Sequence, residues 1–336
     1  MLTMLMQLLL FASKAIIFLV IALLLVIGIA AIVTRGKERL RGRLTIKKLN
    51  EKYKENKLLL LGAILPKDKY KKFLKNEKSN NKKKIKLHEK PKSTIFVLNF
   101  NGDIRASAVA ALREEITAIL NVATSNDEVI VKVESPGGMV HAYGLAAAQL
   151  MRLRDRNISL TVIVDKVAAS GGYLMACIAN KILAAPFAII GSIGVIVQIP
   201  NFNRLLKEKN IDFEQLTAGS FKRTLTMFGH NTDEGREKMR QEIEEIHQLF
   251  KNTILEHRSQ LDIHKVSTGE HWLGTQALEL KLVDGLSTSD DYLLEKSKDN
   301  EIFEITFHMK KSLGERFSAA ASLFKNDLGK TDIYFG

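Results

Sequence analysis

The sequence is poor in cysteine, with Cys177 alone among 336 residues. A single thiol excludes an intramolecular disulfide and says little about the redox compartment. Histidine is also missing from a long internal stretch, because none of the 8 histidines lies between His141 and His230. A Ser-His-Asp relay needs a histidine that follows its serine closely in the fold, so a serine nucleophile in this stretch would need another base.

Most of the chain lacks an excess of basic charge, although the formal net charge is +13. Residues 35–92 hold 22 basic and 6 acidic side chains, whereas residues 93–336 hold 27 basic and 31 acidic ones. The basicity therefore belongs to one segment, and no basic and aromatic pattern recurs in the remainder. Nucleic acid is not an expected partner.

One long apolar run stands near the N-terminus. Residues 15–33, "AIIFLVIALLLVIGIAAIV", carry no charge and would form ~28 Å of helix, close to the thickness of a hydrocarbon core. A cleaved signal peptide is the main alternative, but its apolar region is usually shorter and ends at a small-residue cleavage site. We predict a retained anchor over 1–34, which would bring the chain into contact with membrane lipids.

The charged residues around this anchor bear on its orientation. Only Lys14 precedes the run, whereas five basic side chains follow it between Arg35 and Arg43, which favours a cytoplasmic body. Residues 35–92 are lysine-rich, with an apolar island at 57–65 and a polar run at 75–92. We expect a partly helical juxtamembrane stalk and linker, either a solvated spacer or a contact for anionic lipid or another subunit.

Strand and helix patterns alternate from Ser93 onwards. Such alternation, with helices of 10–18 residues, predicts an α/β fold with parallel βα units. The folded domain is expected over 93–297, followed by a tail over 298–336. Strands are predicted at 94–100, 129–135, 160–165, 181–186 and 212–219, and helices at 106–123, 142–156, from Ser170 and at 233–258.

Residues 182–199 form a second uncharged run, of 18 residues, that could be taken for a membrane span. Pro186, Gly191, Ser192 and Gly194 divide the run into shorter pieces. These residues are typical of turns, so we predict strand, turn and strand within the folded domain.

Three glycine-bearing turns follow predicted strands, where open α/β sheets place their sites. In "ESPGGMVHAYG", the N–H groups of Gly137 and Gly138 could face a pocket and stabilise an oxyanion, or the turn could be an ordinary one. In "AASGGY", Ser170 could be a nucleophile beside the Gly171 N–H, or it could simply cap the following helix. The third, "GSIGV", carries Ser192 and could be no more than a packing turn.

Lysine is the remaining candidate for the base, as in Ser-Lys variants of the triad. Lys222 lies among small and apolar residues in "TAGSFKRTLTMFG", although most lysines are solvated charges. Lys166 is nearer in sequence, but it would leave its strand away from the Ser170 hydroxyl. A lysine base must be largely neutral, which burial beside apolar walls can achieve by lowering its pKa. Ser192 could then hold the neutral amine.

Several of these segments together resemble one family. "VESPGGMVHAYGLAA", "DKVAASGGYLMA", "TAGSFKRTLTMFG" and "GEHWLGTQALELKLVDGLS" are similar to the membrane-anchored serine peptidases of the signal-peptide-peptidase A type, peptidase family S49. Within that family they are most similar to the SohB group of bacterial inner membranes. The resemblance covers about residues 93–295, and the basic segment 35–92 looks like the N-terminal region of that group.

The resemblance implies a ClpP/crotonase-like fold and an endopeptidase that acts on membrane-released or unfolded peptides. Ser170 would be the nucleophile, Lys222 the general base and Ser192 the hydroxyl that orients the lysine. The N–H groups around Gly137, Gly138 and Gly171 would form the oxyanion hole, and no metal or cofactor is implied.

Assembly and membrane topology are also implied. Members of the family form homo-oligomeric rings, in which the two dyad residues can come from neighbouring subunits. They place the catalytic domain on the outer, periplasmic face of the inner membrane, which opposes the orientation that the arginines favour. Two other functions stay open: a crotonase-like acyl-CoA enzyme, which would not need Ser170 together with Lys222, and a non-catalytic membrane scaffold.

Overall fold

The computed structural model describes residues 14, 16–21, 23, 42–86 and 93–309. Their contacts define two compact units. The larger one spans residues 46–306, and the smaller one contains the described residues that precede 46 or follow 306 in the sequence. Most of the predicted anchor 15–33, the linker 87–92 and most of the tail lie outside the described residues, although 16–21 and 23 are helical. In the described ranges, no helix is both long and apolar enough to cross a membrane.

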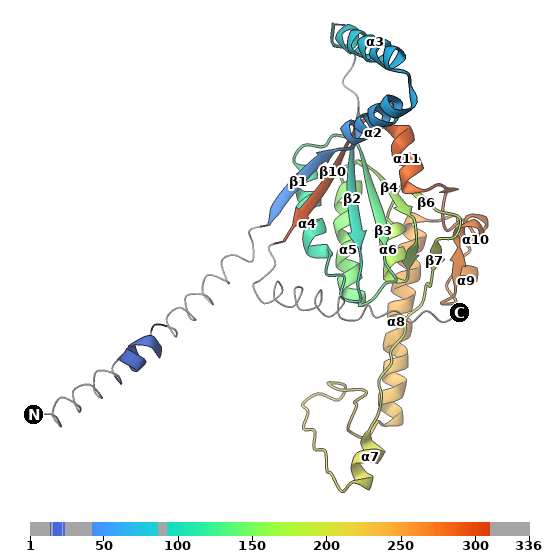
Figure 1. The fold of residues 1–336 in the computed structure, drawn as a ribbon. Helices are drawn as coiled ribbons and strands as arrows, with labels where there is room; N and C mark the ends of the chain where they lie inside the picture. The colour runs from blue at the N-terminus through green and yellow to red at the C-terminus, as the bar shows by residue number, and fades with distance from the viewer. Residues whose placement is uncertain (1–13, 15, 22, 24–41, 87–92, 310–336) are drawn as a thin grey trace, which may run out of the picture. The chain divides into compact units, whose positions relative to one another are not determined.

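A seven-stranded sheet forms the centre of the large unit (Figure 1). Every neighbouring pair from β10 to β9 is parallel, which confirms the predicted α/β fold with parallel βα units. The central strands are aliphatic runs that bury both faces, as expected for a covered parallel sheet. In order across the sheet, the strands are β1 (Arg43–Lys48), β10 (Glu301–His308), β2 (Thr94–Asn101), β3 (Glu128–Glu134), β4 (Ser159–Val164), β6 (Lys181–Ala184) and β9 (Gly285–Leu286).

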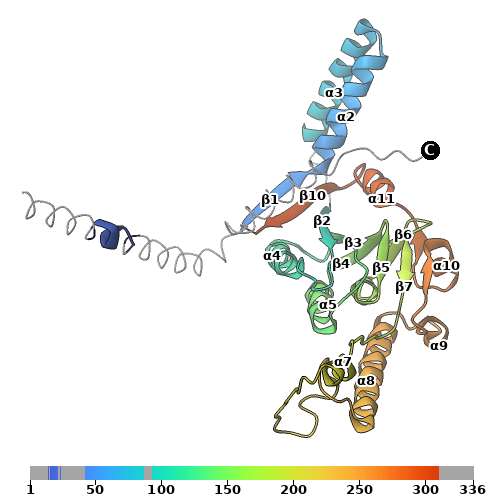
Figure 2. The ribbon, with the colours of Figure 1, turned by 60° about the horizontal axis from the view of Figure 1, so that its bottom comes forward.

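Helices cover both faces of this sheet (Figure 2). On one face lie α4 (Val109–Leu120), α5 (Val140–Arg154) and α6 (Gly171–Ala176). On the other face, Leu49 of α2 (Leu49–Ile64) and Leu293 of α11 (Ser289–Lys296) join a buried cluster with Ile130 of β3. The crossover helices α4 and α5 were both predicted from the sequence, and α6 begins directly after Ser170 as expected.

A second, three-stranded sheet lies beside the first. It contains β5 (Val167–Ala169), β7 (Ile189–Gly191) and β8 (His271–Leu273), with β5 parallel and β8 antiparallel to β7. The uncharged run 182–199 contributes β6 to the large sheet and β7 to this one, with a turn between them. The prediction of strand, turn and strand is therefore confirmed. The small helices α9 (Ile263–Val266) and α10 (Gly274–Glu279) flank β8 in the chain.

A long helix, α8 (Asp233–His257), follows an extended segment, 195–232, which we call the arm. Within the arm only α7 (Asn203–Glu208) is regular. The strand predicted at 212–219 is wrong, because these residues pair with none of the strands in the described ranges and their side chains are exposed. A β-rich pattern needs a neighbouring strand to satisfy its backbone, and the arm offers none.

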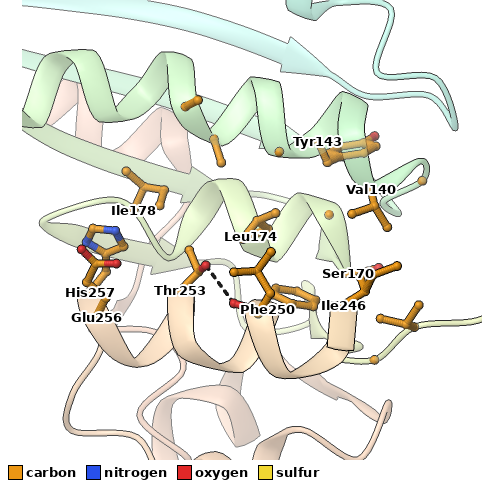
Figure 3. A pocket seen from close by; sticks show the side chains of 18 of the residues that line it. Val140, Tyr143, Ser170, Leu174, Ile178, Ile246, Phe250, Thr253, Glu256 and His257 are labelled. Carbon is orange, nitrogen blue, oxygen red and sulfur yellow. Dashed lines mark hydrogen bonds between the residues drawn. The ribbon is translucent and has the colours of Figure 1, made fainter. Parts of the chain in front are cut away.

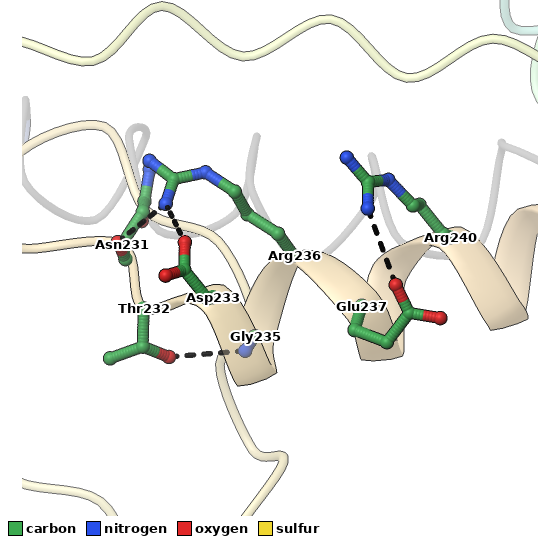
Figure 4. Close-up of polar contacts among 7 residues, drawn as sticks. All are labelled: Asn231, Thr232, Asp233, Gly235, Arg236, Glu237 and Arg240. Carbon is green, nitrogen blue, oxygen red and sulfur yellow. Dashed lines mark hydrogen bonds and ion pairs between the residues drawn. The ribbon is translucent and has the colours of Figure 1, made fainter.

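The start of α8 matches the prediction of a helix over 233–258. Thr232 caps it, since its Oγ1 accepts a 3.0 Å hydrogen bond from the Gly235 N–H (Figure 4). Asp233 lies in the first turn, where the helix dipole favours an acidic side chain, and also forms a 3.0 Å ion pair with Arg236. Arg240 pairs with Glu237 at 3.3 Å. Both ion pairs are exposed, so each stabilises the helix by less than about 1 kcal/mol.

Two helices form where a partly helical stalk is predicted. They are α2 (Leu49–Ile64) and α3 (Lys67–Lys86), joined by a short turn. The start of α2 is tied to the sheet, because the Ile302 N–H donates to Asn50 Oδ1 at 2.7 Å and the Asn50 amide donates to the Asn300 carbonyl at 2.9 Å. Strands β1 and β10 also extend the sheet beyond the predicted domain range 93–297.

Candidate active site

Ser170 occupies a strained turn between β5 and α6. Its φ of 52° and ψ of −118° are rare for a residue with a side chain, and such strain is common at functional sites. Hydrogen bonds fix the backbone on both sides, since the Ser170 N–H donates to the Gly191 carbonyl at 2.7 Å and its carbonyl accepts from Leu174 at 2.9 Å. The Ser170 side chain makes no capping hydrogen bond to α6, so helix capping does not account for it.

The Ser170 side chain lies at one end of an elongated pocket of about 370 Å³ (Figure 3). The walls come from α5, α6, α8 and the turn 194–196, and they are mostly aliphatic. Glu256 and His257 lie at the opposite end. Labelled lining residues include Val140, Tyr143, Leu174, Ile178, Ile246, Phe250 and Thr253.

The turn with Gly137 and Gly138 packs directly against Ser170. Gly137 has φ of 91°, and a Cβ there would lie 2.7 Å from the Ser170 Cβ and 2.8 Å from the Gly171 nitrogen. At Gly138 a Cβ would overlap the Ile104 carbonyl. No residue with a side chain fits at either position without a shift of the backbone, so the glycines allow this close approach.

The three predicted oxyanion donors differ in their hydrogen bonding. The Gly137 N–H donates to Ser135 Oγ at 3.1 Å. For the N–H groups of Gly138 and Gly171, no acceptor is found in the part of the chain that the structure describes. Gly138 and Gly171 also line the pocket beside Ser170. Two of the three N–H groups are thus free to receive a ligand.

The structure does not bring Lys222 to Ser170 within one chain. Lys222 is exposed in the arm and is not one of the residues that line the pocket. Its N–H donates to the Gly219 carbonyl at 3.1 Å, so the residue lies in a local turn. Apolar walls around the Lys222 side chain, expected from the sequence, are absent from the described part of this single chain.

Two further candidate residues are Lys166, which directly precedes β5, and Ser192, which directly follows β7. Ser192 follows Gly191, is half-buried with φ of 52°, and donates its N–H to the Glu270 carbonyl at 2.6 Å. Lys166 is exposed and its Nζ forms a 2.9 Å ion pair with Glu134, away from the pocket. The position of Lys166 therefore agrees with the sequence-based expectation that its side chain points away from the Ser170 hydroxyl.

Sequence reasoning missed two buried hydroxyls behind the glycine turn. Ser135 and Tyr143 are both fully buried, and their oxygens lie 2.6 Å apart. The Tyr143 hydroxyl donates to the Asp103 carbonyl at 2.8 Å. Both residues stand in the motif "ESPGGMVHAYG", but only the folded backbone shows that they meet.

The contribution of α8 to the pocket was also missed. His257 is half-buried and lies at the end of the pocket. Burial holds the pKa of His257 below its usual range, with Glu256 acting in the opposite direction and Arg154 in the same one. Within the described ranges, no group of three His, Cys, Asp or Glu side chains could hold a metal ion.

Comparison with known proteins identifies the family. The model "Peptidase family S49 N-terminal" matches residues 3–150, and "Peptidase family S49" matches residues 152–302. The chain is 49% identical over 313 residues to a "Probable protease SohB" of Haemophilus influenzae, covering 89% of each. It is 49% identical over 315 residues to a protein of the same name from Buchnera aphidicola subsp. Acyrthosiphon pisum, covering 93% of each.

A mutant of the 1510-N membrane-bound stomatin-specific protease in complex with a substrate peptide has a TM-score of 0.43 and 14% identity, over 69% of this chain and 98% of that one. A likeness at that level adds nothing to the assignment. The parallel sheet agrees with the α/β fold that the sequence predicts. With its S49 models and its SohB relatives, the chain belongs to peptidase family S49, as a protease of the SohB type.

Proposed function

We propose that the chain is a membrane-anchored serine endopeptidase with Ser170 as nucleophile and Lys222 as general base. The observation that carries the proposal is the setting of Ser170. Its strained backbone presents the side chain to an apolar pocket, beside the unpaired N–H groups of Gly138 and Gly171. A hydroxyl, two unpaired backbone donors and an apolar pocket are the parts that acyl transfer from a peptide requires.

The reaction passes through an acyl-enzyme. The Ser170 oxygen attacks the peptide carbonyl while the Lys222 amine takes the hydroxyl proton, and the carbonyl oxygen becomes negative. The N–H groups of Gly138 and Gly171 stabilise that charge. Lys222 then returns the proton to the leaving amine, and water hydrolyses the ester on Ser170 by the same route. Ser192 holds the neutral amine by a hydrogen bond.

Lys222 reaches the nucleophile of a neighbouring subunit in this proposal. The arm that carries it exposes large apolar side chains, and Leu216 is 96% exposed and Phe221 47%. A homo-oligomeric ring would cover such side chains and surround Lys222 with apolar walls. Burial of that kind lowers the pKa of a lysine and makes the neutral amine available.

The pocket favours substrates with aliphatic or small side chains, as in signal-peptide-like segments released from a membrane. Residues 15–33 would anchor the chain in the inner membrane, with the catalytic domain on the periplasmic face. Residues 49–86 hold 13 lysines and 4 acidic residues, so α2 and α3 would contact anionic lipid headgroups.

Peptide cleavage by the detergent-extracted full chain tests the proposal. Ser170→Ala and Lys222→Ala should each abolish turnover of a fluorogenic peptide with leucine before the scissile bond, and Lys166→Ala should not. Mass spectrometry of the wild type with an activated ester should find the acyl group on Ser170. Undiminished turnover in either the Ser170 or the Lys222 variant overturns the assignment.

Mixing the two inactive variants tests the exchange between subunits. Subunits with Ser170→Ala still supply Lys222, and subunits with Lys222→Ala still supply Ser170. Dissociation and reassembly of the mixture should therefore restore part of the activity. Two inactive variants that do not complement each other would place the dyad within one subunit.

A further inference from the structure

A buried line of hydrogen bonds runs behind the glycine turn of the site. The Gly137 N–H donates to Ser135 Oγ at 3.1 Å, Ser135 Oγ lies 2.6 Å from the Tyr143 hydroxyl, and that hydroxyl donates to the Asp103 carbonyl at 2.8 Å. Ser135 and Tyr143 are both 0% exposed. Buried polar groups of this kind are costly to leave unpaired, so the line is a defined part of the fold.

The protons in this line can point only one way. The Asp103 carbonyl can only accept, so the single Tyr143 hydroxyl proton is committed to it. Ser135 must therefore donate to the Tyr143 oxygen and accept from the Gly137 N–H. Burial raises the pKa of Tyr143, so the phenol keeps the proton that the arrangement needs.

This line fixes the peptide that carries the Gly138 N–H. Gly137 has φ of 91° and, as a glycine, little intrinsic preference for that conformation. The hydrogen bond to Ser135 holds the residue before Gly138, and a 2.8 Å hydrogen bond from the Met139 N–H to the Ile104 carbonyl holds the residue after it. The unpaired N–H of Gly138 is thus held between two fixed neighbours.

The Tyr143 ring also supports the second donor. A Cβ at Gly171 would overlap the ring of Tyr143, so the ring lies directly against the residue that carries the other free N–H. The ring packs edge-on against Phe100, with 6.3 Å between the ring centroids. The ring of Tyr143 therefore lies against Gly171, and its hydroxyl is linked to the Gly137 N–H through Ser135.

We propose that Ser135 and Tyr143 are positioning residues for peptide hydrolysis, acting as one hydrogen-bonded unit that directs the Gly138 N–H toward the oxyanion. The inference rests on the proposed role of Ser170 as nucleophile. In this proposal the Gly137 N–H is occupied by its hydrogen bond to Ser135, so the oxyanion donors are the N–H groups of Gly138 and Gly171 alone.

Tyr143→Phe tests the proposal most directly, because it removes the hydroxyl and keeps the ring against Gly171. Loss of one oxyanion donor costs about 100–1,000-fold in kcat, and a donor that is present but loosely held should cost less, about 10–100-fold. KM should change by less than about 3-fold, since the pocket that holds the substrate side chain is intact. Ser135→Ala should have the same effect, and the double variant should be no worse than the poorer single one.

A peptide aldehyde provides a readout that a merely structural role would not move. The Ser170 oxygen bonds to the aldehyde carbon and the hydroxyl proton passes to Lys222, so the adduct carries the same oxyanion as the reaction. Affinity for the aldehyde should fall in parallel with kcat in both variants. Affinity for the product peptide with a free carboxylate, measured by competition, should fall less.

Tyr173→Phe is the matched control. Tyr173 is equally buried and its hydroxyl donates to the Leu282 carbonyl at 2.9 Å, away from the glycine turn. Its kcat per folded molecule should stay at the wild-type value. A Tyr143→Phe enzyme with wild-type kcat, or one whose kcat falls no more than that of Tyr173→Phe, would overturn the proposal.

Failure of the proposed function gives a different result. Turnover in Ser170→Ala would remove the nucleophile on which the inference rests. An inactive Ser170→Ala enzyme beside a fully active Tyr143→Phe enzyme would overturn the positioning role alone. Equal losses of affinity for the aldehyde and for the product peptide would assign Ser135 and Tyr143 to packing of the pocket.

Discussion

Gly144 offers a way to narrow the proposed substrate pocket without disturbing its walls. It lies within α5 and lines the pocket, and a Cβ built on it meets no atom within 4 Å. A leucine at this position would extend into the pocket and fill space that a substrate side chain needs. The pocket measures about 370 Å³, so a single large side chain takes up a substantial part of it.

The size of the effect follows from the apolar contact that is lost. Full burial of a leucine-sized side chain is worth about 1.5–3 kcal/mol, which corresponds to about 10–150-fold in kcat/KM. Glycine is less favourable than other residues inside a helix, by about 0.8–1 kcal/mol relative to alanine. Gly144→Leu should therefore keep or raise the stability of the fold while it removes the preference for large side chains.

The assay compares kcat/KM for two peptides that differ only in leucine or alanine before the scissile bond. Gly144→Leu should lose the stated factor with the leucine peptide and retain the alanine peptide. Gly144→Ala is the matched control and should stay near the wild type with both. Equal cleavage of the leucine peptide by Gly144→Leu and the wild type would refute this pocket as the site that receives the substrate.

Further predictions concern stability and reactivity. Arg258 is buried and donates twice to the Asp284 carboxylate at 2.8 Å, so Arg258→Ala should lower the free energy of unfolding in urea by about 3–5 kcal/mol, and Arg258→Met with Asp284→Leu should recover much of it. Because burial lowers the pKa of His257, its contribution to stability should be complete above pH of about 6.5 and should decline as the pH falls through that value. His257→Gln should flatten this part of the stability profile, and an unchanged slope would contradict the assignment. Burial raises the pKa of Cys177 to about 12, so its thiol should resist alkylation at pH of about 8 until the chain unfolds. Rapid labelling of the folded chain would contradict that burial.

The parallel sheet could be predicted because its signals are local. The aliphatic runs at 94–100 and 160–165 became β2 and β4 within one residue, since a strand covered on both faces must be continuously apolar. The place of Ser170 between a strand and a helix could be predicted for the same reason, because the small residues around it mark a sharp turn, but its strained backbone could not.

Features that depend on distant segments could not be predicted. Strand β10 joins β2 from about 200 residues away in the chain, and its own pattern does not show that partner. The residues 212–219 resemble a strand, but no described strand pairs with them. The meeting of Ser135 with Tyr143 depends on how the glycine turn folds back onto α5, which no periodicity in the sequence encodes.

Helix α8 connects the arm that carries Lys222 with the pocket beside Ser170. The first turn of α8 packs on the arm, where a Cβ at Gly235 would overlap the Thr224 carbonyl, and its last three turns line the pocket beside Ser170. A rod of 25 residues, ~37 Å long, transmits a tilt from one end to the other. If Lys222 acts in the active site of a neighbouring subunit, docking of the arm would supply the base to that neighbour. The same docking would also change the position of α8, and with it the pocket of the subunit that owns the arm. An isolated subunit would then lack a complete catalytic dyad, and peptidase activity would be confined to the assembled oligomer.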